Sequence, residues 1–183
     1  MPDWSAQRPL YPHKQRIIKT VAQSCQHAAH GGLRNRQTLG GFAADVLPYL
    51  ADTKAWGTYY HNAENIVVGD GSTTKLSADA DFVFDTFGFH VTCKVEEFDI
   101  GKDGNLVRLA WSGTFGEGED FSDVYHAWIL ENLPNNRVRV LTEESQIGKL
   151  AKGLAETVPN PMVNGHQAWL DGLTKAAKNK AAY

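Results

Sequence analysis

Residues 123–145 read DVYHAWILENLPNNRVRVLTEES, and this stretch decides the fold. It predicts two strands around a turn, with side chains that alternate between two faces. In the first strand, one face carries His126, Trp128 and Leu130. In the second, the arginines mark the solvent face, so the inward residues are Val138, Val140, Thr142 and Glu144. A histidine and a carboxylate therefore point toward a face that would normally be dry.

The strands predicted before this pair have inner faces that are almost wholly apolar. In LVRLAWSG (106–113), Arg108 lies outside, and Val107, Leu109 and Trp111 face inward. In the strand after Gly88, the inward residues are Val91, Cys93 and Val95. The preceding DFVFDTFG leaves two choices open, Phe82 with Phe84 or Val83 with Asp85.

The order of elements favours an α+β domain with a curved antiparallel sheet. A helix is expected at 12–29, a strand at 33–40 and two short helices over 43–62, with Pro48 in a first turn and Gly57 as a stop. About six strands follow from residue 64, and short connections between them predict a meander.

The chain is expected to end in helices. A first helix would place Ile147, Leu150 and Leu154 on one side until the Pro-Asn-Pro sequence at 159–161 interrupts it. Asn160 is then expected to cap a long helix that begins at Pro161. The apolar stripe of this helix comprises Met162, His166, Trp169, Leu170, Leu173 and Ala177.

These elements resemble the helix-grip (SRPBCC, START-like) superfamily, including its polyketide cyclase/dehydrase members. The resemblance rests on AADVLPYLADTKAW (43–56), LVRLAWSG, HAWILENLPNNRVRVLTEESQIG (126–148) and HQAWLDGLTKAA (166–177), and it covers about residues 33–179. It implies an apolar cavity between the sheet and the C-terminal helix, in which members bind lipids, hormones or polyketides. It implies no universal catalytic motif.

The expected cavity wall combines aromatic side chains with a few polar ones, which is typical of a ligand pocket. Tyr59, Tyr60 and His61 are expected at the mouth. The other candidate ligand-binding residues are Phe82, Phe84, Trp111, Trp128, Thr142, Met162, Trp169 and Leu170.

The candidate catalytic residues are His126, Glu144 and His166. A His126–Glu144 pair across adjacent strands would suit enolisation of a β-keto unit, aldol closure and dehydration, as in a cyclase/dehydratase that needs no cofactor. The alternative for His126 is a core histidine satisfied by a backbone carbonyl or by Thr142. Glu144 could instead be solvated near the end of its strand.

A non-catalytic carrier for a hydrophobic molecule could use the same pocket, and a protein-interaction module is a third hypothesis. The main interpretation includes no metal ion. A zinc site of His61, His126, His166 and Glu144 is a further alternative, although no local spacing supports it.

Composition and charge argue against nucleic acid and membrane as partners. The 183 residues are 42% hydrophobic and 21% charged, with a net charge of −3 and no basic cluster, so nucleic acid is not expected. Without a signal peptide or a long apolar run, a cytoplasmic protein without membrane insertion is expected. Residues 1–30 are expected to form an arm and helix, residues 31–183 the ligand-binding domain, and the protein a monomer or homodimer.

Overall fold

The computed structural model describes residues 32–180 of the chain. The arm and helix predicted within residues 1–30, together with Cys25, lie outside the described residues. The elements in chain order are β1 (Gly32–Gly40), α2 (Ala43–Ala51), α3 (Thr53–Tyr59), β2 (Glu64–Val68), β3 (Asp81–Thr86), β4 (Phe89–Ile100), β5 (Leu106–Phe115), the 3₁₀ helix η2 (Gly118–Asp120), β6 (Ser122–Leu133), β7 (Arg137–Ile147), α4 (Lys149–Ala155) and α5 (Pro161–Lys180).

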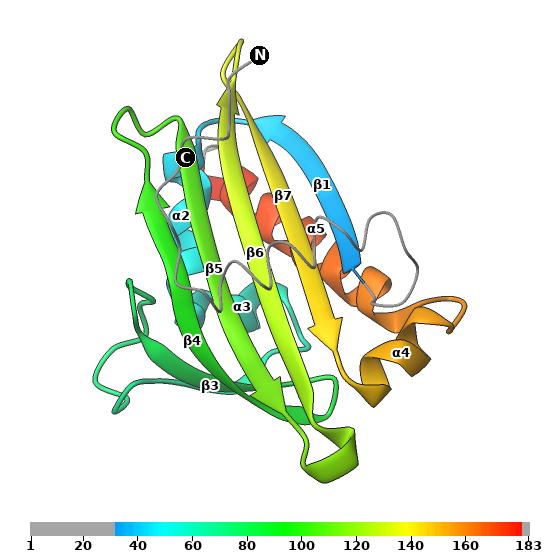
Figure 1. Cartoon of the computed structure of the whole chain (residues 1–183). Coiled ribbons are helices and arrows are strands. Elements are labelled where there is room, and N and C mark those ends of the chain that lie inside the picture. The colour runs from blue at the N-terminus through cyan, green and yellow to red at the C-terminus, as the bar shows by residue number, and fades with distance from the viewer. Residues whose placement is uncertain (1–31, 181–183) are drawn as a thin grey trace.

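The strands form one antiparallel sheet in the order β1-β7-β6-β5-β4-β3-β2. Strands β2 to β7 are a meander, and β1 closes the other edge by pairing with β7. A register shift between Val95 and Glu97 in β4 bends the sheet, because a bulge adds a residue to one strand only. Helices α2, α3 and α5 lie on one face of this curved sheet (Figure 1). The predicted α+β architecture, with a sheet that grips a long C-terminal helix, is confirmed.

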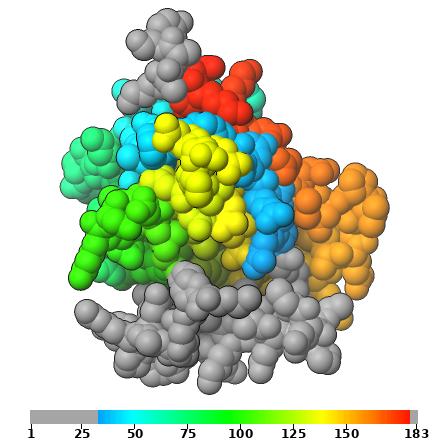
Figure 2. All heavy atoms as spheres, turned by 90° about the horizontal axis from the view of Figure 1, so that it is seen from above, coloured from blue at the N-terminus to red at the C-terminus, as the bar shows by residue number. Residues whose placement is uncertain are grey.

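Helix α5 lies against β1, β7, α2 and α3. Asn160 caps it as predicted, since its side-chain oxygen accepts hydrogen bonds from the backbone N–H groups of Met162 (2.9 Å) and Val163 (3.2 Å). All six residues of the predicted apolar stripe are buried. Helix α4 and the start of α5 project from the body beside β1 (Figures 1 and 2).

Three local predictions were wrong. Pro48 lies inside α2, because the helix already begins at Ala43, where the Asp45 carboxylate accepts the Phe42 N–H (2.9 Å). Gly57 does not stop α3, whose last turn is closed by a bond from Tyr60 N–H to Trp56 O (2.8 Å). Ile147 belongs to β7, where it pairs with Asp123, and its side chain is exposed.

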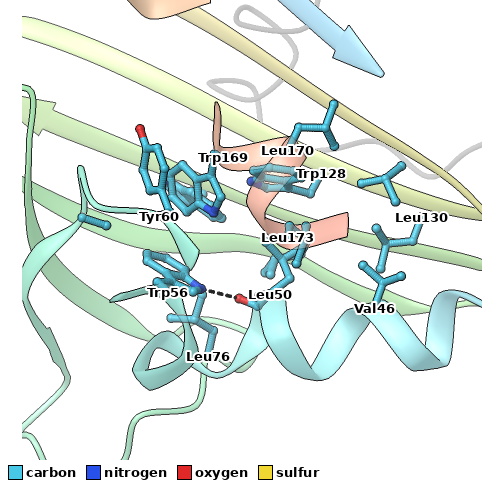
Figure 3. Packing of buried hydrophobic residues seen from close by; sticks show 14 of the residues in the cluster. Val46, Leu50, Trp56, Tyr60, Leu76, Trp128, Leu130, Trp169, Leu170 and Leu173 are labelled. Atoms are coloured by element: carbon cyan, nitrogen blue, oxygen red, sulfur yellow. Dashed lines mark hydrogen bonds between the residues drawn. The ribbon is translucent and has the colours of Figure 1, made fainter. Parts of the chain in front are cut away.

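The centre of the core is an aromatic group around Trp56, whose indole is fully buried. Its ring lies edge-on to Trp169 (5.0 Å between centroids) and stacks on Trp111 (5.9 Å). The indole N–H donates to the Leu50 carbonyl (2.9 Å), so this large side chain is buried without losing its hydrogen bond (Figure 3). The helices are thereby tied to the sheet by aromatic packing. Among the described residues, no helix is long and apolar enough to cross a membrane.

Candidate functional site

A cavity of about 270 Å³ lies between the sheet and the first turns of α5. Its wall is mostly apolar and is lined by Tyr60, Phe84, Thr86, Phe87, Phe89, Val91, Trp111, Gly113, Phe115, Val124, His126, Glu144, Gln146, Leu154, Pro161, Met162, His166 and Trp169. The polar side chains of β6, β7 and α5 gather at one part of this wall. An apolar cavity with a few convergent polar groups is the usual composition of a small-molecule site.

The structure brings all three candidate catalytic residues to this wall, together with part of the expected ligand-binding set. The candidates that line it are Tyr60, Phe84, Trp111, Met162 and Trp169. Six others do not line it: Tyr59, His61, Phe82, Trp128, Thr142 and Leu170. Phe82, Trp128, Thr142 and Leu170 are buried in packing behind the wall, Tyr59 is half-buried beside α5, and His61 is exposed.

Sequence reasoning missed the hairpin between β3 and β4 as part of the wall. Thr86, Phe87 and Phe89 line the cavity, and the Phe87 ring lies over Gly165 of α5, where no side chain intervenes. Phe87 holds a positive φ of 51°, a conformation that is uncommon for a bulky residue. The Phe-Gly sequence at a predicted strand break was the available signal, but the contact with α5 is a tertiary one.

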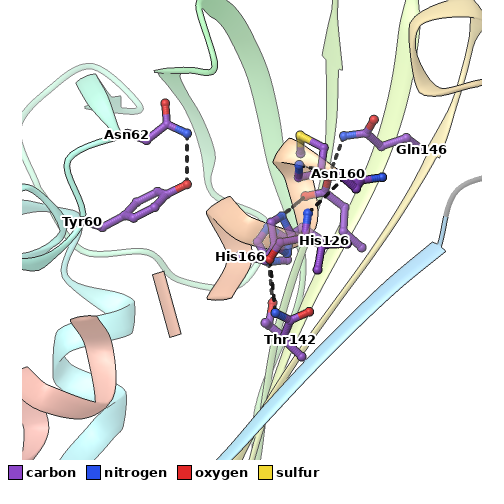
Figure 4. Close-up of polar contacts among 11 residues, drawn as sticks. Tyr60, Asn62, His126, Thr142, Gln146, Asn160 and His166 are labelled. Carbon is purple, nitrogen blue, oxygen red and sulfur yellow. Dashed lines mark hydrogen bonds and ion pairs between the residues drawn. The ribbon is translucent and has the colours of Figure 1, made fainter. Parts of the chain in front are cut away.

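His126, Glu144 and His166 form a compact buried cluster, here called the His–Glu–His cluster. His126 and Glu144 are direct cross-strand partners on β6 and β7, and His166 reaches them from α5. One carboxylate oxygen, Oε2 of Glu144, lies 3.3 Å from His126 Nδ1 and 3.2 Å from His166 Nε2. The two imidazoles are stacked, with 4.6 Å between centroids and 21° between planes (Figure 4).

Two further side chains orient the cluster from outside. Thr142 Oγ1 lies 2.7 Å from His126 Nε2, and the Gln146 amide donates to Oε1 of Glu144 (2.6 Å). Because a carboxylate only accepts hydrogen bonds, the tautomer of His126 that suits this geometry carries its proton on Nδ1, toward Glu144. In that tautomer, Nε2 accepts the hydroxyl proton of Thr142. The Thr142 partner expected for a core histidine is therefore present, alongside the carboxylate.

Burial controls the charges in this cluster. Burial, reinforced by the neighbouring imidazole of His166, holds the pKa of His126 well below its ordinary value, against the opposing effect of Glu144. Burial alone would raise the pKa of Glu144, but interactions with His166, His126 and Gln146 outweigh it and lower that pKa. At neutral pH the cluster therefore contains a carboxylate beside a neutral His126.

The cluster is not fully satisfied by the described residues. Among them, His166 Nδ1 and the nearby indole nitrogen of Trp128 are buried without a hydrogen-bond partner. An unpaired buried polar atom costs about 1–3 kcal/mol, so native proteins rarely keep one without a reason. Functional sites are a common reason.

His61 lies in a different, more polar pocket that also contains Glu64, Asp85 and His90. There Asp85 accepts from Asn65 (2.6 Å) and lies 2.6 Å from His90 Nδ1, and these two partners lower its pKa. His61 therefore does not join His126, His166 and Glu144. The four-residue zinc site considered from the sequence was therefore wrong in including His61.

The structure of the hypothetical protein jhp0584 from Helicobacter pylori is 38% identical to this chain. The match covers 97% of this chain and 99% of that one, with a TM-score of 0.79. The chain belongs to the same family as jhp0584. No protein-family model matches this chain, and a comparison with the curated proteins found no match.

Two less similar structures share the fold of this chain. Ara h 8.0201 is 11% identical over 82% of this chain and 99% of its own, with a TM-score of 0.61. The di-domain ARO/CYC StfQ from the steffimycin biosynthetic pathway is 13% identical over 82% of this chain and 46% of its own, with a TM-score of 0.57. These likenesses confirm the predicted helix-grip fold.

Proposed function

We propose that the protein is an enzyme that holds a small, largely apolar carbonyl compound in the cavity and acts on it by proton transfer. The observation that carries this proposal is the convergence of three ionisable side chains on the wall of an otherwise apolar cavity, where Glu144 Oε2 lies 3.3 Å from His126 Nδ1 and 3.2 Å from His166 Nε2. A carrier needs such a wall to be apolar, but it does not need three buried ionisable groups in contact. Burying ionisable groups costs free energy that must be offset by pairing and hydrogen bonds, and a binding site for an apolar molecule does not require it.

The cavity volume limits the substrate. At about 270 Å³, the cavity lies near the lower end of the roughly 300–1,000 Å³ that is usual for ligand pockets. A small compound of one or two rings, or an acyl chain of similar bulk, therefore suits this space. The aromatic side chains of Trp111, Trp169 and Phe84 suit the flat faces of such a compound.

The reaction we propose is of the cyclase/dehydratase type. The Glu144 carboxylate takes a proton from the carbon next to a carbonyl, and an imidazole N–H stabilises the enolate oxygen. In a β-hydroxy carbonyl compound, the enolate then expels the hydroxyl group, which leaves as water with a proton supplied by the cluster. Proton transfer by positioned side chains typically contributes about 10²–10⁴ in rate.

Native mass spectrometry of the full chain as purified, compared with its denatured mass, would identify a retained organic compound. Turnover is then measured on one- or two-ring relatives of that compound, with wild type, His126→Ala and Glu144→Gln. We expect both variants to lose at least about 100-fold in kcat. Tyr125→Phe is the matched control, because Tyr125 alternates with His126 on β6 and its hydroxyl bonds to Glu97 on the other face of the sheet (2.7 Å).

A carrier of a hydrophobic molecule is the second candidate, and the mostly apolar wall favours it. The same variants separate the two functions. In a carrier, Glu144→Gln alters affinity for the retained compound only modestly, and no variant changes the compound chemically. Wild-type protein that binds the compounds without converting any of them would overturn the enzymatic proposal.

A further inference from the structure

We propose that His126, Glu144 and His166 bind one divalent transition-metal ion of the zinc class at the cavity wall, with an open coordination position toward the cavity. The three side chains come from three elements, and each offers one donor atom within 4.8 Å of the other two. Metal binding would be a second property of the same side chains, and it does not rest on the reaction proposed above, in which Glu144 acts as a carboxylate free of metal.

Two of the three separations between donor atoms match those that a metal requires, and the third is within 4.8 Å. Ligand atoms about 2.0–2.2 Å from a zinc ion lie roughly 3.0–3.5 Å from one another in tetrahedral or octahedral arrangements. The two separations that involve Glu144 Oε2, 3.3 Å and 3.2 Å, fall in this range. The carboxylate therefore already stands between the two imidazoles at ligand spacing.

One ring has to turn before both imidazoles can point at the same ion, because nearly parallel stacked rings direct their lone pairs side by side. His126 is fixed by contacts at both nitrogens, to Thr142 and to Glu144. His166 is held at Nε2 alone, since its Nδ1 has no partner among the described residues. His166, which has fewer polar contacts than His126, is thus the ring that we expect to rotate about its Cβ–Cγ bond when a metal binds.

The surroundings of the donors match those of known metal ligands, whose remaining polar atoms are held by a second layer of hydrogen bonds. His126 would bind through Nδ1 and keep Thr142 at Nε2 (2.7 Å). The Thr142 hydroxyl can donate or accept, so it serves His126 before and after the ring proton moves to Nε2. Glu144 would bind through Oε2 and keep Gln146 on Oε1 (2.6 Å).

The donor chemistry selects the metal class. Two imidazole nitrogens and one carboxylate oxygen suit zinc and its neighbours, whereas calcium and magnesium prefer sites made of oxygen atoms. Three protein ligands leave at least one coordination position, as in catalytic zinc sites. Because the cluster lines the cavity, that position would face the bound compound and could polarise its carbonyl.

The test uses full-length protein treated with EDTA and then dialysed free of it. Zn²⁺ binding is measured by calorimetry, and Co²⁺ serves as a spectroscopic probe because its visible bands report nitrogen and oxygen coordination. We expect one high-affinity Zn²⁺ per chain and a Co²⁺ spectrum that Zn²⁺ abolishes. Glu144→Gln and His166→Gln should each lose more than about 100-fold in Zn²⁺ affinity, and Thr142→Val about 10–100-fold.

His90→Gln is the matched control, because it removes a histidine that pairs with Asp85 and lies outside the cluster. It should bind Zn²⁺ as wild type does.

Thermal unfolding of each metal-free variant establishes whether it folds. If a variant of a metal ligand does not fold, Thr142→Val still tests the site, because it keeps the three donor side chains. Wild type that takes up no Zn²⁺, or wild type and His166→Gln that bind it equally, would overturn the proposal. If the protein binds Zn²⁺ but converts no compound, the metal site stands and the proposed enzymatic function is refuted. If it binds no Zn²⁺ and its turnover is unchanged by EDTA, the enzymatic function stands and the metal site is refuted.

Discussion

Replacing Gly172 by alanine tests how tightly α5 is packed in the grip of the fold. A Cβ atom at this position would lie 2.1 Å from the carbonyl oxygen of Tyr59 and 3.0 Å from its ring. Tyr59 is the last residue of α3, so the obstacle is backbone rather than the movable end of a side chain. The two helices can therefore approach this closely only with glycine at position 172.

Two effects of opposite sign decide the outcome. Alanine is favoured over glycine inside a helix by about 1 kcal/mol. Overpacking typically costs about 1–3 kcal/mol, and we expect the upper end here, because the contact must open by more than 1 Å against backbone. The free energy of unfolding should therefore fall by about 2 kcal/mol, which corresponds to a Tm lower by roughly 4–8 °C for a chain of this size.

Urea and thermal unfolding followed by circular dichroism would measure this change. Gly153→Ala in α4 is the matched control, since a Cβ there meets no atom within 4 Å. It should gain up to about 1 kcal/mol from helix propensity. If Gly172→Ala were as stable as wild type or more stable, the close contact between α5 and α3 would be refuted.

Three other predictions concern the cavity and the outer face of the sheet. Burial, and then the charge of Glu144, raise the pKa of the Cys93 thiol. In a Cys25→Ser background, Cys93 should therefore react with iodoacetamide at pH 8 many times more slowly in the folded protein than after unfolding in urea, and equal rates would contradict its burial. Gly165→Ala puts a Cβ 2.2 Å from the tip of the Phe87 ring, a side chain that can swing away from the cavity. A small, uncharged apolar ligand should therefore dissociate several-fold faster in stopped-flow measurements with little loss of stability, and unchanged rates would show that Phe87 does not control access. Burial and the hydrogen bond to Glu97 raise the pKa of Tyr125 above its ordinary value near 10, so its contribution to stability is complete below pH 10 and is lost as the pH rises further. In urea titrations, Tyr125→Phe should lose less stability than wild type above pH 10, and the same pH dependence in both proteins would refute this role of Tyr125.

The faces of the strands could be predicted from the sequence because alternation is a local property. The arginines of β7 mark the solvent side, and the inward set that includes Thr142 and Glu144 is buried as predicted. The ambiguous strand β3 buries Phe82 and Phe84, a choice made by packing against Trp56 rather than by the strand itself. Its own alternation gave no preference.

The meeting of His126, Glu144 and His166 could be predicted only in part. The pairing of His126 with Glu144 follows from the length of the turn between β6 and β7, whereas the approach of His166 depends on the crossing of α5 over the sheet. The helix start at Asn160 fixes which residues face inward, but not which strand they meet. For the same reason, sequence reasoning placed Trp128 and Thr142 on the cavity wall, although both lie one layer behind it.

We propose that the His–Glu–His cluster serves chemistry rather than stability. To test this, the free energy of unfolding is measured, in urea with EDTA, for a variant in which His126, Glu144 and His166 are replaced by leucine and Thr142 by valine. Replacing a buried ionisable cluster by apolar side chains of similar size is often neutral or stabilising by about 1–4 kcal/mol. We predict that the variant is at least as stable as wild type to within about 1 kcal/mol. A loss of more than about 3 kcal/mol would contradict the claim and assign the cluster a structural role.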